Sequence, residues 1–157
     1  MVNDTFTVER STTIDAPPER VYEQVADFHN WPSWSPWEGM DPQMQRTYSG
    51  AEAGQGSKYA WSGNRKVGQG SMEITDTAEP SHVDIDLVFE KPFKAHNTTA
   101  FSIDREGSGS RVTWSMIGEN TVATKLMGLF KSMDKMVGPD FEKGLARLKT
   151  TAERSAA

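Results

Sequence analysis

The sequence predicts an α+β fold in which a curved antiparallel sheet of six or seven strands wraps around a long C-terminal helix. Two observations lead to this prediction. Between Gln43 and Asn120, apolar and polar residues alternate in short segments separated by turns, which is typical of strands with one buried face. From about Val122 to Glu153, apolar residues recur at steps of three and four, which predicts one amphipathic helix. A helix with one apolar stripe needs a broad apolar partner, and the predicted sheet supplies it.

The first element is predicted as a strand over Phe6–Ile14, because its apolar residues alternate with polar ones. Arg10 has the parity of the apolar residues. An isolated buried charge is costly, so we expect its guanidinium to reach the rim of the core or to pair with an acid. Glu119 is a candidate partner, since the first and last strands of such sheets are often neighbours. We favour this salt bridge over a ligand contact.

Two short helices are predicted after this strand. Pro17-Pro18 suits the first turn of a helix that should end near Asp27. A second helix is expected to begin at Pro32, with a turn at Pro36, inside the segment Asn30–Trp37, which reads NWPSWSPW. We interpret its tryptophans as a hydrophobic plug that closes one end of the core, in preference to a carbohydrate-stacking or partner-binding site.

The alternating segments form a meander of strands joined by short turns, which implies antiparallel pairing with the apolar parity facing inward. Strands are predicted over Ser57–Ser62, Val67–Thr77, Val83–Phe89, Ala95–Ile103 and Val112–Met116.

The long helix is expected to kink at Gly138-Pro139, because proline lacks a backbone donor and crowds the preceding turn. In the sheet, Gly68, Gly70 and Gly118 are compatible with bends or bulges. A strongly twisted sheet that bends around a helix packs well at its ends and can leave a gap in its middle. The pattern is compatible both with such a gap and with a well-filled core; if a cavity is present, we expect the helix to roof it between Phe130 and Val137.

Composition bounds the classes of function. The chain of 157 residues suits one domain, with an ordered core over about 5–152. The chain has a net charge of -5 and lacks the basic footprint of a nucleic-acid-binding protein. It has no cysteine, no apparent signal peptide and no apolar run long enough for stable membrane insertion. We therefore expect a cytoplasmic protein, and the sequence leaves its oligomeric state open.

No catalytic or metal-binding motif is found. His29, His82 and His96 are too scattered for a metal site and are expected on the surface. Asp84 and Asp86 share the outer parity of their strand and are interpreted as solubilising charges rather than an acid–base pair. No phosphate-binding or nucleophile motif is present, so no cofactor and no metal are expected.

The order of strand, helix, tryptophan-rich segment, meander and long helix resembles the SRPBCC superfamily, over nearly the whole chain from Phe6 to about Ala152. That superfamily includes the START lipid-transfer domains, the polyketide cyclases and the birch pollen allergen family. The resemblance implies a helix-grip fold with a deep cavity, in a member of polyketide cyclase/dehydrase type. Its motifs are mostly structural, so no catalytic residue is carried over. The most telling segments are Ile14–Val21, Asp27–Trp37, Arg111–Trp114 and Phe141–Lys149.

The candidate ligand-binding residues share the inward parity of their strands or the apolar stripe of the helix. Arg10, Tyr59 and Asn97 are also the candidates for steering a proton transfer, should the protein be an enzyme. The full set of ligand-binding candidates is Tyr59, Trp61, Met72, Ile74, Leu87, Phe89, Asn97, Thr99, Phe101, Trp114, Met116, Phe130, Met133 and Val137.

The leading hypothesis is that the protein binds or carries a small hydrophobic molecule, such as a lipid, a polyketide or an aromatic metabolite. It follows from the resemblance and from the many Met and aromatic residues on inward parities. An enzyme of cyclase or dehydratase type is the first alternative, although no inward histidine or carboxylate pair is seen. A protein-interaction regulator is the second, and it would need a large exposed apolar patch.

Overall fold

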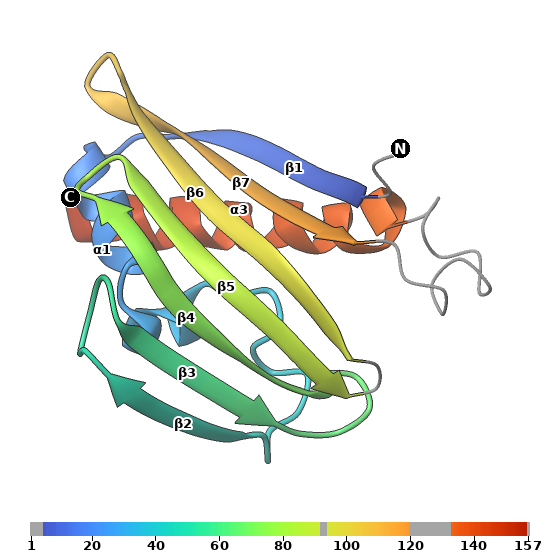
Figure 1. The fold of residues 1–157 in the computed structure, drawn as a ribbon. Coiled ribbons are helices and arrows are strands. Elements are labelled where there is room, and N and C mark those ends of the chain that lie inside the picture. The colour runs from blue at the N-terminus through green and yellow to red at the C-terminus, as the bar shows by residue number, and fades with distance from the viewer. Residues whose placement is uncertain (1–4, 92–93, 120–132, 157) are drawn as a thin grey trace.

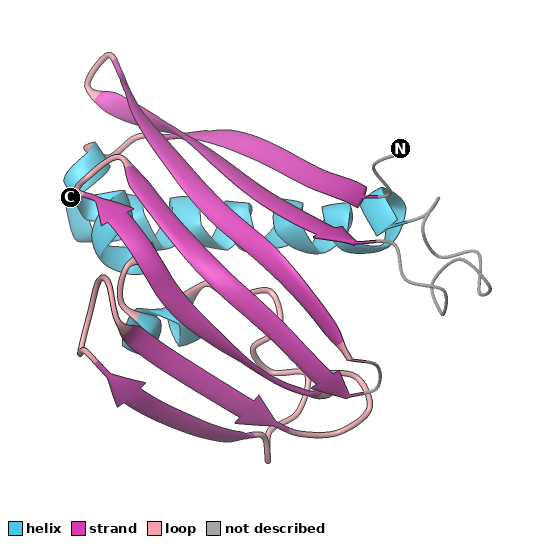
Figure 2. Cartoon of the chain, viewed as in Figure 1, coloured by secondary structure: helices cyan, strands magenta, loops and turns pink. Residues whose placement is uncertain are grey.

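The computed structural model describes residues 5–91, 94–119 and 133–156. One curved sheet of seven antiparallel strands packs against the C-terminal helix α3, which crosses behind β1, β7 and β6 (Figures 1 and 2). The spatial order of the strands is β1-β7-β6-β5-β4-β3-β2. Their bounds are β1 Thr5–Ile14, β2 Gln45–Gly50, β3 Ser57–Ser62, β4 Gln69–Ala78, β5 His82–Lys91, β6 Ala95–Glu106 and β7 Gly109–Glu119. The predicted fold class is therefore confirmed.

The strand predictions hold in position, with differences at the ends. Val67 was expected in a strand, but β4 begins only at Gln69. The reason is the turn after β3, where Gly68 has a φ of 65° and its carbonyl accepts a hydrogen bond from the Gly63 N–H at 3.0 Å. Such a left-handed backbone favours glycine and ends the extended run.

Both short helices are present. Helix α1 (Pro18–Val25) begins with proline in its first turn, as expected, and the 3-10 helix η1 follows over Phe28–Ser33. The prediction that the second helix begins at Pro32 is wrong by four residues. The cause is a cap at Asp27, whose carboxylate accepts a hydrogen bond from the His29 backbone N–H at 2.9 Å.

Helix α3 (Met133–Ala156) buries the apolar stripe that the sequence indicates. Phe141, Leu145 and Leu148 are each at most 2% exposed. The helix is tightly packed at Gly144, where an added Cβ would lie 2.8 Å from Pro36 Cδ and 2.9 Å from Trp114 Cζ3. The expected first turns of the helix, from Val122, lie outside the described residues.

Pro139 lies inside α3, which is assigned as helical on both sides of it. The kink at Gly138-Pro139 stays a prediction. Gly138 has a clearer role, because a Cβ at this position would overlap Arg10 Nη2. The helix therefore lacks a side chain at the point where the arginine of β1 reaches across it.

Arg10 does not pair with Glu119, and that prediction is wrong. In the β1–β7 register Glu119 lies opposite Thr5, half a strand away from Arg10. The guanidinium instead reaches α3, where Nη1 and Nη2 donate to the two carboxylate oxygens of Asp134 at 2.8 and 2.9 Å. Its Nε donates to Glu142 at 2.8 Å. These three residues, here called the Arg10 cluster, tie β1 to the first half of the helix.

Within the described residues, no helix combines the length and the apolarity that crossing a membrane requires.

Candidate functional site

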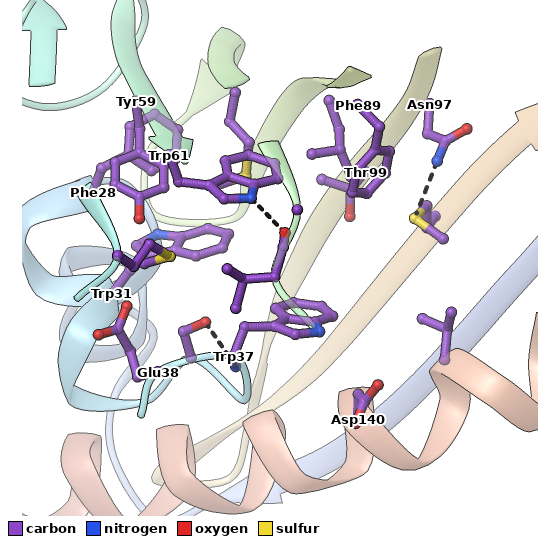
Figure 3. Close-up of a pocket in the computed structure, with 18 of the residues that line it drawn as sticks. Phe28, Trp31, Trp37, Glu38, Tyr59, Trp61, Phe89, Asn97, Thr99 and Asp140 are labelled. Carbon is purple, nitrogen blue, oxygen red and sulfur yellow. Dashed lines mark hydrogen bonds between the residues drawn. The ribbon is translucent and has the colours of Figure 1, made fainter. Parts of the chain in front are cut away.

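A cavity of about 280 Å³ lies between the concave face of the sheet, the segment after α1 and helix α3 (Figure 3). Three charged lining residues, Arg65, Lys66 and Lys91, are exposed where the β3–β4 turn meets the end of β5, and we take this place as the mouth of the cavity. Its walls are largely aromatic and aliphatic. The lining residues are Phe28, Trp31, Pro32, Ser35, Trp37, Glu38, Met44, Tyr48, Tyr59, Trp61, Arg65, Lys66, Val67, Gly68, Met72, Leu87, Phe89, Lys91, Asn97, Thr99, Trp114, Met116, Val137, Asp140 and Phe141.

Most of the predicted ligand-binding residues lie on this cavity. Those that line it are Tyr59, Trp61, Met72, Leu87, Phe89, Asn97, Thr99, Trp114, Met116 and Val137. Two predicted residues, Ile74 and Phe101, do not line it and are fully buried in the packed core instead. Phe130 lies outside the described residues, as does the side chain of Met133. Arg10 does not line the cavity, because the Arg10 cluster holds it against α3.

The cavity occupies only the half of the sheet nearest the mouth. On β6, Asn97 and Thr99 line it, whereas Phe101, two residues further along, does not. On β4, Met72 lines it and Ile74 does not. In the far half, Trp31 and Trp34 pack against Phe101, which is why that residue belongs to the core, and Ile74 is fully buried as well.

The tryptophan-rich segment closes this far half, as the plug interpretation expects. Trp34 is fully buried and Trp31 is 6% exposed, and their rings contact Phe101 edge-on at centroid distances of 5.7 and 6.0 Å. Their indole N–H groups donate to the backbone carbonyls of Gln24 and Val25, both at 3.1 Å. Buried indoles need such acceptors. The plug is thus fixed to α1 by hydrogen bonds as well as by packing.

Sequence reasoning missed that this segment also forms a wall of the cavity. Trp31 and Trp37 line the cavity, and the half-buried Trp37 contacts Trp114 and Phe141 edge-on at 5.9 and 6.4 Å. Trp114 and Phe141 stack at 3.9 Å with an interplanar angle of 3°. Phe141 also lines the cavity and was not among the predicted ligand-binding residues. It follows Val137 by four residues on the apolar stripe of the helix, and this spacing was the signal that could have identified it.

A row of aromatic side chains crosses β2, β3 and β5 along the other wall. Tyr48, Tyr59, Trp61 and Phe89 follow one another at centroid distances of 5.3, 6.1 and 5.9 Å. Gly70 makes room for this row, because an added Cβ would lie 2.7 Å from the Trp61 ring. The β4–β5 register also shifts between Gln69 and Gly70, as expected for a bulge there.

The Thr99 hydroxyl in the cavity wall is already fully engaged. Its Oγ1 donates to the Ser115 carbonyl at 2.6 Å and accepts from the Trp114 indole N–H at 2.9 Å. Both the hydroxyl and the indole are therefore satisfied without a ligand. Thr99 orients Trp114, which in turn stacks on Phe141.

Asn97 is placed differently. It is 6% exposed and lines the cavity, yet the hydrogen bond of its carboxamide within the described chain is the weak one from Nδ2 to Met116 Sδ at 3.7 Å. Gly118 lies opposite Asn97 in the β6–β7 register, and this register has no bulge at that pair. An added Cβ on Gly118 would overlap Asn97 Oδ1, so this glycine provides space for the carboxamide. A buried amide with so weak a partner retains hydrogen-bonding capacity.

Tyr59 lies next to an ion pair at the β2 side of the cavity. Arg46 of β2 pairs with Glu38, which lines the cavity. Burial raises the pKa of Tyr59 to about 12, against the opposing effect of Arg46. The Tyr59 hydroxyl is therefore protonated at neutral pH and can donate a hydrogen bond.

The structure offers no metal centre among its described residues, in which no group of three or more His, Cys, Asp or Glu side chains could hold an ion. His29, His82 and His96 lie on the surface and pair with Asp27, Asp84 and Asp86 respectively. Asp84 and Asp86 are therefore partners of surface histidines and do not face the cavity.

The topology, with one long helix lying in the curve of a seven-stranded antiparallel sheet above a cavity, defines a helix-grip protein. The chain belongs to the family described as polyketide cyclase / dehydrase and lipid transport, whose model matches residues 5–153. No curated protein matches the sequence significantly.

Several solved structures share this fold. A protein of unknown function from Staphylococcus aureus has a TM-score of 0.72 at 12% identity, covering 98% of this chain and 96% of that one. A protein from Thermus thermophilus has a TM-score of 0.68 at 18% identity, with coverages of 96% and 99%. The major latex-like protein 151 of Panax ginseng has a TM-score of 0.66 at 18% identity, with coverages of 98% and 99%. At such identities the likeness establishes the fold alone.

Proposed function

We propose that this protein binds and carries a small hydrophobic molecule, such as a lipid, a polyketide or an aromatic metabolite, in its internal cavity. The observation that carries the proposal is the cavity itself, with a volume of about 280 Å³ and a largely aromatic and aliphatic lining. Transfer of apolar surface out of water contributes roughly 25 cal/mol per Å², so such a lining favours an apolar ligand.

Asn97 and Tyr59 are the polar groups that we propose orient the ligand. Asn97 brings a carboxamide whose partner is a thioether sulfur. Tyr59 brings a protonated hydroxyl, and burial raises its pKa to about 12. Both lie on the apolar wall. A ligand oxygen that accepts from either group would compensate the cost of burying it.

Binding is supported better than catalysis. Among the described residues, no histidine lines the cavity. Arg10 is held outside it, and the raised pKa of Tyr59 argues against a role as general base. A cyclase or dehydratase would therefore have to act through positioning alone.

The proposal is tested by calorimetric titration with decanol, an uncharged apolar probe. Val137 of α3 lines the cavity and is half-buried, so Val137→Trp should fill the space and abolish binding. Ile117→Trp is the matched control, because Ile117 is 49% exposed and does not line the cavity. Binding by the wild type and by Ile117→Trp, with loss in Val137→Trp, supports the proposal. Absence of binding to the wild type, or equal binding to all three proteins, would overturn it.

A further inference from the structure

We propose that the ligand is an anionic amphiphile, whose carboxylate or phosphate headgroup lies at the cavity mouth against Arg65, Lys66 and Lys91. The inference rests on the proposed function and adds the chemical class of the ligand. All three side chains line the cavity and are exposed. Three cations around one opening stand out in a chain with a net charge of -5.

The β3–β4 turn that carries Arg65 and Lys66 is held in place by hydrogen bonds between side chains and its backbone. The Asp41 carboxylate accepts from the Asn64 N–H at 2.7 Å. The Asn64 side chain accepts in turn from the Lys66 N–H at 2.9 Å. At the other end of the turn, the Trp61 indole N–H donates to the Val67 carbonyl at 2.7 Å. The two cations are thus presented from a fixed turn that is bonded to the cavity wall itself.

Lys91 reaches the same opening from a different strand. The β4–β5 register places it opposite Gln69, the first residue after the β3–β4 turn. Figure 1 shows the β3–β4 turn and the end of β5 at the same end of the sheet. The fold therefore gathers cations that lie about 25 residues apart in the sequence.

The carboxylates that line the cavity do not cancel this charge. Glu38 forms an ion pair with Arg46. Asp140 of α3 is the other lining carboxylate among the described residues. Within the described part of the chain, Arg65, Lys66 and Lys91 form no ion pair with an acid. Among the residues that line the cavity, the three exposed cations thus outnumber Asp140, the one lining carboxylate without an ion pair in the described chain.

This arrangement suits a molecule with two unlike ends. The apolar body gains free energy by leaving water, and the anionic end stays at the exposed rim, where it does not pay the desolvation cost of a buried charge. An exposed ion pair contributes little by itself. Three cations around one anion together should give a preference of roughly tenfold over an uncharged analogue.

The test compares decanoate with decanol, which share an apolar chain and differ in the charge of the headgroup. Both are titrated calorimetrically at neutral pH into the wild type and into the rim variant Arg65→Gln/Lys66→Gln/Lys91→Gln. The matched control is Lys58→Gln/Lys143→Gln/Arg154→Gln, which removes the same charge from exposed positions that do not line the cavity. The wild-type titrations are repeated at higher salt, which should weaken the preference for decanoate only if that preference is electrostatic.

The wild type and the control should bind decanoate roughly tenfold more tightly than decanol, with a smaller ratio at high salt. In the rim variant the ratio should fall to about one. Equal affinities in the wild type, or a preference that survives in the rim variant, would overturn the headgroup inference and leave the proposed function standing. Failure of both probes to bind the wild type would contradict the proposed function instead.

A separate arm distinguishes a free amphiphile from a lipid headgroup in a membrane. Wild-type protein and the rim variant are each sedimented with vesicles of phosphatidylglycerol and of phosphatidylcholine. Equal, low sedimentation with both supports a free ligand. Rim-dependent sedimentation with phosphatidylglycerol, combined with equal affinities for decanoate and decanol, would assign the cations to a membrane surface and overturn the inference.

Discussion

Arg10 and Gly138 meet across the β1–α3 interface, and the space left by the missing side chain of Gly138 is occupied by the Arg10 guanidinium. Asp134 and Glu142, one helical turn to either side of Gly138, hold the guanidinium there. Val137, the residue before Gly138, lines the cavity. The Arg10 cluster therefore anchors the part of α3 that forms a wall of the cavity.

This relationship predicts opposite effects of Gly138→Ala in two backgrounds. In a helix interior, alanine normally stabilises by about 1 kcal/mol relative to glycine. In the wild type this gain should be lost or reversed, because the new Cβ displaces Arg10 from Asp134 and Glu142. In an Arg10→Ala background the gain should reappear. Urea denaturation of the four proteins measures both effects, and an equal gain in both backgrounds would contradict the contact.

The Asp134–Arg10 ion pair predicts a pH dependence of stability. The hydrogen bond from Arg10 lowers the pKa of Asp134. A carboxyl group with a lowered pKa in the folded state stabilises the protein above its unfolded pKa of about 4, and this contribution is lost as the pH falls through the folded value. Asp134→Asn should therefore be less stable than the wild type at neutral pH, and the difference should shrink in acid. Denaturation midpoints at several pH values measure it; a difference independent of pH would contradict the pair.

Tyr59 predicts a transition at alkaline pH. Its pKa of about 12 means that the folded state favours the neutral phenol, so its stabilising contribution is complete below about pH 10 and is lost as the pH rises toward 12. In an absorbance titration, one tyrosine should ionise near pH 12 and be missing from Tyr59→Phe. If the transition that is lost in this variant lies near pH 10 instead, Tyr59 is not shielded from water in the way the structure describes.

The Thr99–Trp114 hydrogen bond predicts a specific loss of stability. Thr99→Val keeps the shape of the side chain but leaves the buried Trp114 indole N–H without its acceptor. An unsatisfied buried donor costs about 1–3 kcal/mol. Thr99→Ser retains the hydroxyl and should lose less. Chemical denaturation of the two variants separates the missing hydroxyl from the missing methyl group; equal losses would mean that the hydrogen bond contributes nothing.

The architecture could be predicted from the sequence because most strands alternate and α3 carries one apolar stripe, although β2, which is exposed except at Tyr48, has no such pattern and was not predicted. The extent of the cavity could not be predicted in this way. Thr99 and Phe101 have the same parity on β6, yet one lines the cavity and the other belongs to the core. Parity gives the face of a residue but not its distance from the tryptophan plug, which depends on how Trp31 and Trp34 pack against the far half of the sheet.

The partner of Arg10 could not be predicted for a related reason. The β1–β7 pairing was expected, but its register places Glu119 opposite Thr5. The acids that do pair with Arg10 lie on α3, and no sequence pattern fixes the position of a helix along a sheet. Gly138 was a signal, since glycine is unfavourable in a helix interior and marks a close approach. Sequence reasoning assigned it to a kink instead.

The central claim, that the cavity binds an apolar ligand, is tested most directly by NMR of the methionine methyl groups. Met44, Met72 and Met116 line the cavity, whereas Met40 and Met136 are exposed and do not. During a titration with decanol, the methyl resonances of the three lining methionines should shift together and saturate, while those of Met40 and Met136 stay in place. Shifts confined to the exposed methionines, or no saturable shift at Met72 and Met116, would contradict the account.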